Sequence, residues 1–306
     1  MAQRVILDTD IGTDVDDAYA LALLLKSPEV EIEAVTTVWA DAELRARIAR
    51  KQLNLMGRED VPVAVGYSKP MEGGRPAFLF GHEINYLSHE DGNLEISDTP
   101  AAELIESLLR KHPHEIKVLA MGPQTTLGTM LLQKPDLGTL VKEFVIMGGL
   151  PLYGPPEMER IGERPLETNF AADPRATRAV FDCGAPITLV GANVTMPVLL
   201  TQEHIELIRK RGTPATDFLY DMTVDWLRVI GLSETPMHDP LAVAAAFTLD
   251  FLDTMMLNVT IETKGELTAG LPVVNRYENE EWNTVRVATD VRINEFMEFM
   301  IERILA

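Results

Sequence analysis

The 306-residue sequence predicts an α/β fold, a single large domain with a mostly parallel, open, Rossmann-like sheet flanked by helices. Short apolar runs rich in valine and isoleucine alternate with helix-length amphipathic stretches, a pattern typical of strands that are buried on both faces. No low-complexity linker, internal repeat or block of charge divides the chain. We therefore expect one domain over residues 1–306.

The order of the elements follows from these runs. Continuous apolar runs predict strands at 4–7, 32–38, 61–65, 116–121, 144–147, 187–190, 257–262 and 284–291. Apolar residues at helical spacing predict helices at 18–26, 43–56, 101–111, 241–247 and 294–305. Segments around 75–90 and 213–235 are expected to be loops. Ligands of such sheets lie beyond the carboxyl ends of the strands, so the residues that follow each strand matter most.

Composition restricts the partners of the protein. Lys and Arg total 27 against 47 Asp and Glu, a formal net charge of −20, and this field would repel nucleic acid and anionic membranes. No apolar run reaches the ~20 residues of a membrane-spanning helix. The chain enters its first predicted strand with no basic and apolar leader, and the single cysteine, Cys183, fits a reducing compartment. We expect a cytoplasmic protein.

A cluster of carboxylates follows the first predicted strand. Five of them fall within ten residues: Asp8, Asp10, Asp14, Asp16 and Asp17. Two like charges ~4 Å apart repel by about 4 kcal/mol at an effective dielectric of 20, so such a group needs a cation, raised pKa values, or distance and water. An ordinary acidic loop, with Asp16 or Asp17 capping the next helix, is the structural alternative.

Oxygen ligands alone favour a hard cation, Ca²⁺ or Mg²⁺. An EF-hand is excluded, because counting from Asp8 its glycine position holds Thr13 and its closing glutamate position holds Tyr19. Gly12 permits a tight turn that could gather the carboxylates. A Mg²⁺-dependent phosphatase of the haloacid dehalogenase type, with Asp8 as nucleophile, also begins with a strand and Asp-x-Asp, but its motif has Thr or Val where this chain has Gly12.

Other predicted strand ends carry polar groups that suit the same site. These are Gly122-Pro123-Gln124-Thr125, Met147-Gly148-Gly149, Glu167-Thr168-Asn169 and His238-Asp239-Pro240. A Gly-Pro turn can direct a backbone carbonyl at a cation, and a histidine can exchange a proton near neutral pH. The structural alternatives are a plain turn and a helix start with Asp239 as N-cap. The aromatic residues Trp39, Phe80, Tyr86, Tyr220 and Trp226 could stack on a base, although each alone fits ordinary packing.

In this order, the segments resemble the nucleoside hydrolase family, the inosine–uridine-preferring N-ribohydrolases, over nearly the whole chain. The resemblance rests on Asp8-Thr9-Asp10-Ile11-Gly12 with Asp16-Asp17-Ala18, on Thr36-Thr37-Val38, and on the four segments just named, the second of which extends back to Val145. It implies hydrolysis of the N-glycosidic bond of ribonucleosides to ribose and a free nucleobase, and a homodimer or homotetramer.

The resemblance also implies roles for individual residues. Asp10, Asp17, Asp239 and the backbone carbonyl of Thr125 would bind Ca²⁺, and Asp16, which directly precedes the matched Asp17-Ala18, is favoured over Asp14 as the general base. Glu167, Asn169, Met147 and Asp41 would contact the substrate, with Asp41 standing where many members have a sugar-binding Asn. His238, and less strongly His82, would lie beside the leaving base. A non-catalytic Ca²⁺-dependent nucleoside or sugar binder on the same scaffold stays open.

Overall fold

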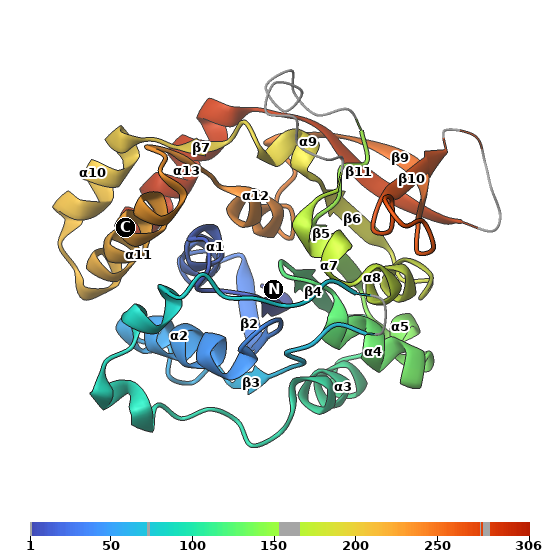
Figure 1. Cartoon of the computed structure of the whole chain (residues 1–306), viewed down its shortest axis with the longest axis horizontal. Helices are drawn as coiled ribbons and strands as arrows, with labels where there is room; N and C mark the ends of the chain where they lie inside the picture. The colour runs from blue at the N-terminus through green and yellow to red at the C-terminus, as the bar shows by residue number, and fades with distance from the viewer. Residues whose placement is uncertain (1, 72–73, 153–165, 276, 278–281) are drawn as a thin grey trace.

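A nine-stranded sheet forms the centre of the molecule, with the strand order β10-β9-β11-β6-β5-β4-β1-β2-β3 (Figure 1). The computed structural model describes residues 2–71, 74–152, 166–275, 277 and 282–306. The strands are β1 (Gln3–Thr9), β2 (Val30–Thr37), β3 (Val63–Val65), β4 (Ile116–Ala120), β5 (Glu143–Met147), β6 (Ile187–Val190), β9 (Leu252–Ile261), β10 (Pro272–Asn275) and β11 (Asn283–Val291). β7 (Leu199–Leu200) and β8 (Thr235–Pro236) pair separately.

The sheet is parallel from β11 to β3, and only β9 and β10 run antiparallel to their neighbours. The α/β class and the mostly parallel sheet predicted from the sequence are therefore confirmed. The strand expected at 257–262 is the second half of the longer β9, and the strand expected at 61–65 begins only at Val63.

Helices cover both faces of the sheet (Figure 1). One face carries α1 (Asp16–Leu25), α2 (Ala42–Leu55), α10 (Gln202–Arg211), α11 (Pro214–Ile230), α12 (His238–Ala244) and α13 (Ile293–Leu305). The other carries α3 (Ala101–Lys111), α4 (Thr125–Gln133), α5 (Asp136–Leu140) and α8 (Pro174–Phe181). Shorter elements are η1 (Glu83–Tyr86), η2 (His89–Asn93), α7 (Thr168–Ala172) and α9 (Ala192–Thr195).

Two apolar cores lie between these layers, one on each face of the sheet. In β1, Val5 and Leu7 belong to one core and Ile6 to the other, as the two-residue side-chain period of a strand requires. All three side chains are fully buried. Burial on both faces explains why the strands appear in the sequence as uninterrupted apolar runs.

The prediction of a loop at 213–235 was wrong, because α11 occupies most of this segment. Thr213 accepts a hydrogen bond from the Thr216 amide at 3.2 Å, and Pro214 follows at the first helical position. Both residues are also common in turns, but in this order they start a helix. The helix brings Trp226 and Ile230 to the cavity described below.

No helix among the described residues has the length and apolar character needed to cross a membrane.

Candidate active site

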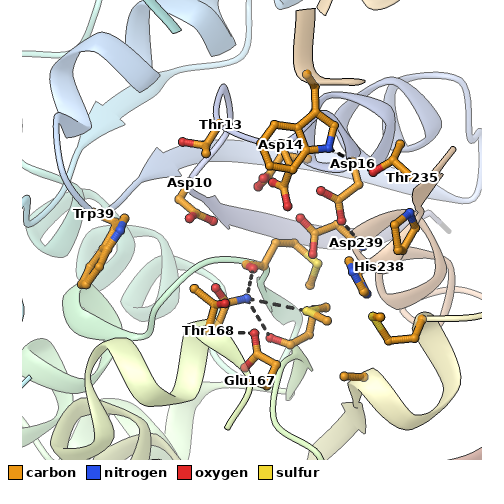
Figure 2. Close-up of a pocket in the computed structure, with 18 of the residues that line it drawn as sticks. Asp10, Thr13, Asp14, Asp16, Trp39, Glu167, Thr168, Thr235, His238 and Asp239 are labelled. Carbon is orange, nitrogen blue, oxygen red and sulfur yellow. Dashed lines mark hydrogen bonds between the residues drawn. The ribbon is translucent and has the colours of Figure 1, made fainter. Parts of the chain in front are cut away.

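A cavity of about 510 Å³ opens where the carboxyl ends of β1, β4 and β5 meet (Figure 2). The side chains that line it are Asp10, Thr13, Asp14, Asp16, Asp17, Trp39, Arg45, Phe78, Phe80, Met121, Met147, Leu150, Leu166, Glu167, Thr168, Asn169, Ala192, Met196, Trp226, Ile230, Thr235, Pro236, His238 and Asp239. Of the residues expected in the site, the structure brings eight here: Asp10, Asp16, Asp17, Met147, Glu167, Asn169, His238 and Asp239.

The carboxylates after β1 turn inward and do not form a solvated loop. Asp14, Asp16 and Asp17 each place a carboxylate oxygen within 4.8 Å of the others. The α1 helix starts at Asp16 with Val15 as its N-cap and no side-chain capping bond, so neither Asp16 nor Asp17 caps it. Gly12 has a φ of +115°, a value that glycine adopts without strain, and this makes the turn into the cluster possible.

Neighbouring groups hold two of the acids in place. The Thr9 hydroxyl donates to Asp17 Oδ1, and the Asp239 amide donates to Asp16 Oδ2 at 3.1 Å. The second bond joins α1 to the first turn of α12, where Met237 and not Asp239 is the N-cap. The Asp239 carboxylate is thus free to face the cluster, as Figure 2 shows.

Crowding and burial disfavour ionisation of this cluster. Burial, followed by the neighbouring carboxylates, raises the pKa of Asp10, Asp16 and Asp239 well above the ordinary value. The pKa of Asp17 rises to about 6 for the same reasons. Acids in this condition either retain protons or bind a cation, and an all-oxygen donor set of this kind fits Ca²⁺ or Mg²⁺.

Arg45 of α2 is a fully buried cation beneath this turn. Its guanidinium donates to the backbone carbonyls of Asp10, Ile11 and Trp39 and to the Thr13 hydroxyl. These bonds fix the turn that carries the acids, and the Arg45 charge opposes the upward pKa shift of Asp10 and Asp17. The sequence analysis missed this residue. An arginine in an amphipathic helix is normally solvent-exposed, so its position in the sequence did not indicate a role in the site.

The backbone that lies beside Asp10 is the Met121–Gly122 segment. The Met121 carbonyl accepts a hydrogen bond from Asn169 Nδ2 at 2.6 Å, and Met121 lines the cavity. A Cβ atom at Gly122 would lie 2.7 Å from Asp10 Oδ1, so only glycine leaves room for that carboxylate.

Thr125, by contrast, is not among the cavity residues. It is the first residue of α4, where a carbonyl is directed along the helix towards an amide one turn on. Its hydroxyl donates to Asp173 at 2.8 Å, and Asp173 caps α8.

Two further expected substrate contacts also lie outside the cavity. Asp41 caps α2 by accepting from the Leu44 amide at 3.0 Å and borders a neighbouring hollow that shares only Phe78 with the site. His82 is buried behind the cavity wall, with Nε2 2.7 Å from the Thr13 carbonyl oxygen.

Glu167 and Asn169 lie at the start of α7. The Glu167 carboxylate accepts from the amides of Gly149, Asn169 and Phe170, at 2.7, 2.7 and 3.1 Å. Burial nevertheless raises its pKa. The three bonds fix the start of α7 against the end of β5, and so position the Asn169 amide on the cavity wall.

Aromatic side chains form part of the cavity wall. Phe80 packs edge-on against Trp226 at 5.7 Å, and the His82 ring stacks on Trp226 at 6.0 Å. Trp39, Phe80 and Trp226 line the cavity, whereas Tyr86 and Tyr220 do not. Phe78 and Phe80 are half exposed at its mouth, an exposure that binding of a flat apolar ligand would reduce.

His238 is the first residue of α12 and lines the cavity next to Asp239. Its Nδ1 lies 2.7 Å from the hydroxyl oxygen of Thr195 in α9. Burial lowers the pKa of His238 to about 4, so its ring is neutral near pH 7. The ring can therefore offer a hydrogen bond but carries no charge of its own.

A large parallel sheet that holds an acidic pocket and an aromatic wall at one rim defines a hydrolase-like site for a small polar and aromatic ligand. The family model described as inosine-uridine preferring nucleoside hydrolase matches residues 5–298. The chain belongs to this family, and it is an enzyme of the N-ribohydrolase class.

Individual proteins agree with the family assignment. Pyrimidine-specific ribonucleoside hydrolases RihA of Citrobacter koseri and Salmonella paratyphi C are 30% and 32% identical, covering 99% of this chain and 98% and 99% of theirs. The solved structure of the purine-preferring ribonucleoside hydrolase from Gardnerella vaginalis is 26% identical with a TM-score of 0.87 and covers 99% of this chain and 98% of that one. A plant nucleoside hydrolase, PpNRh1, is 26% identical with a TM-score of 0.83 over the whole of both chains.

The position of Asp8 argues against the phosphatase alternative. Its nucleophile, Asp8, is fully buried in β1 and does not line the cavity. Asp8 Oδ1 accepts from the Thr36 hydroxyl at 2.6 Å, and burial raises the Asp8 pKa to about 7.

The acid cluster predicts an unusual pH dependence of stability in the presence of a chelator. Asp8, Asp10, Asp16 and Asp239 keep protons in the folded state that the unfolded chain has released, so the unfolding free energy should fall as pH rises through their folded pKa values. We expect a fall of about 1 kcal/mol or more between pH 6.5 and 8. The window starts at 6.5 because the lowered pKa of His238 acts in the opposite direction below it.

Urea unfolding at several pH values measures this slope. Asp8→Asn should make it shallower, and Asp60→Asn, at an exposed position, should leave it unchanged. Excess Ca²⁺ should stabilise the protein most at pH 8, where the acids are most ionised. A free energy that is flat or rises from pH 6.5 to 8 without metal would contradict the shifts.

Proposed function

We propose that this enzyme catalyses Ca²⁺-dependent hydrolysis of the N-glycosidic bond of ribonucleosides, giving ribose and a free nucleobase for nucleoside salvage in the cytoplasm. The observation that carries the proposal is that one cavity is lined both by a group of carboxylates and by aromatic side chains. The whole chain would act as one domain, and the subunits as a homodimer or homotetramer. Pyrimidine ribosides are the first substrates to test, because the RihA relatives carry that specificity in their names.

The carboxylates of the cavity suit a cation and the sugar. Asp10, Asp17 and Asp239 would hold Ca²⁺, and we assign the backbone ligand to the Met121 carbonyl in place of Thr125, because Met121 lines the cavity beside Asp10. When bound, Ca²⁺ would lower the pKa of a water molecule and orient the ribose diol. Glu167 and Asn169 would contact the ribose, and the carboxylates would favour the positive charge that develops on its ring.

The base that takes the proton from water is one of three carboxylates. The sequence favours Asp16, whose Oδ2 accepts from the Asp239 amide and whose carboxylate lies beside Asp14. Asp10 is the competitor, because its carboxylate accepts no hydrogen bond from another described residue and is partly exposed to the cavity. Asp14 is the third acid that could serve, and it lies with Asp16 and Asp17.

The aromatic side chains of the cavity suit the departing base. Phe80 and Trp226 would stack on it, and His238 would donate a hydrogen bond to the negative charge that develops as the glycosidic bond breaks. His82 would act behind this wall, through its contact with Trp226.

A reducing-sugar assay over a nucleoside panel tests the proposal. Uridine and cytidine should release ribose, a chelator should abolish the release, and Ca²⁺ should restore it. A phosphomonoester assayed alongside should release no phosphate. Nucleoside binding without any sugar product would favour the non-catalytic binder and overturn the proposal.

Substitution of the acids separates the base from the metal ligands. We expect Asp10→Ala to lose Ca²⁺ binding and activity together, and Asp16→Asn to lower turnover at least ~100-fold with Ca²⁺ still bound. Calorimetric Ca²⁺ titration and steady-state kinetics on the same preparations measure both properties. Asp182→Asn, at the exposed end of α8, is the control.

The converse result would exchange the roles. If Asp10→Asn keeps Ca²⁺ but loses turnover, and Asp16→Asn loses mainly substrate affinity, then Asp10 is the base. Full activity in both variants would place the role on Asp14.

The role of His238 depends on the leaving group. His238→Ala should lower turnover of uridine strongly and turnover of nitrophenyl riboside little, because nitrophenolate departs without help. The measurement is the ratio of kcat/KM for the two substrates. Equal losses on both would count against stabilisation of the leaving group by His238.

A further inference from the structure

Thr195 is not among the residues that line the cavity, and its hydroxyl contacts the cavity residue His238. It is fully buried on α9, and its hydroxyl oxygen lies 2.7 Å from His238 Nδ1. The other ring nitrogen, Nε2, makes no hydrogen bond to a described residue and is not among the buried unpaired polar atoms, so it is accessible from the cavity. The ring is thus fixed at one nitrogen and open at the other.

The position of the proton on the ring follows from the needs of the hydroxyl. A buried O–H group that donates to nothing costs about 1–3 kcal/mol. Within the described part of the chain, His238 Nδ1 is the one hydrogen-bond partner of the Thr195 hydroxyl. If the hydroxyl instead accepted from an Nδ1–H group, its own proton would have no acceptor. The satisfied arrangement has Thr195 donating to Nδ1, and this requires the ring proton on Nε2.

We propose that Thr195 is a positioning residue that keeps the proton of His238 on Nε2, the nitrogen that faces the departing nucleobase. The proposal rests on the function proposed above and extends it to a residue that contacts neither sugar nor base. With the opposite tautomer, Nε2 would present a lone pair to the developing negative charge and would repel it. Thr195 would thereby convert a neutral histidine into a fixed hydrogen-bond donor.

Three variants test this inference. Thr195→Val keeps the shape of the side chain and removes the hydroxyl, and Thr195→Ser restores a hydroxyl. Thr260→Val is the matched control, because Thr260 is also buried and its hydroxyl has no hydrogen-bond partner. All three are prepared as full-length protein with Ca²⁺ present.

The direct readout is the ¹⁵N NMR spectrum of the histidine rings, in which His238→Gln identifies the His238 signals. In the unsubstituted protein and in Thr195→Ser, we expect a protonated Nε2 and an unprotonated Nδ1. In Thr195→Val the proton should shift towards Nδ1. An Nδ1–H signal in the unsubstituted protein overturns the proposal, and this measurement needs no variant of Thr195 to fold.

Kinetics give the second readout. Thr195→Val should lower kcat for uridine at least ~10-fold, part of the ~100-fold or more that a positioned proton donor contributes. It should change kcat for nitrophenyl riboside less than about twofold, and Thr195→Ser should recover most of the loss. Equal losses on both substrates, or an unchanged ratio with the proton shifted, would overturn the proposal. If no variant releases ribose and the spectra are as expected, the proposed function fails and the tautomer assignment stands.

Discussion

The mutual repulsion of buried carboxylates at the end of β1 is the constraint on which the site depends. Six acids line one cavity, and burial together with neighbouring carboxylates raises the pKa of four of them, Asp10, Asp16, Asp17 and Asp239. A folded chain tolerates this arrangement only if protons or a cation neutralise part of the charge. The local backbone is built to hold the acids in this arrangement. Arg45 secures the turn through three carbonyls, Gly12 gives it its shape, and Gly122 leaves space for Asp10.

The sheet brings together the segments that carry the site residues. The clustered aspartates come from the turn after β1, from α1 and from α12, the amide of Asn169 comes from the start of α7, and the carbonyl of Met121 comes from the end of β4. These segments are far apart in sequence and meet because parallel strands end at the same edge. A hydrogen bond between Asp16 and the Asp239 amide joins the first of these segments to the last. The geometry of the acid cluster is therefore a property of the whole sheet.

The sequence alone predicted the class of fold and singled out the aspartates that the structure brings to one cavity, because both depend on local patterns. Buried parallel strands appear as apolar runs, and acids after a strand end are visible by position. It failed where a role depends on which way a side chain turns. Thr125 and Asp41 satisfy helix starts and do not line the cavity, whereas Arg45 and Met121 do. The segment expected to be a loop at 213–235 contains a helix. Because of this helix, Trp226 lines the cavity and Tyr220 does not.

The polarity of the cavity parallels the charge changes of N-glycoside cleavage. As the bond breaks, positive charge grows on the sugar and negative charge on the base, and the cavity is lined by carboxylates and by a neutral, hydrogen-bonded histidine. A protonated histidine there would be drawn towards the acids, whereas a neutral ring held by Thr195 is available to the base. The formal charge of −20 adds a selection by charge. A neutral nucleoside crosses that field at little cost, while the phosphate of a nucleotide is repelled by the molecule and by the acids in the cavity. The same acids that create the electrostatic strain thus favour an uncharged substrate that becomes positively charged only during the reaction.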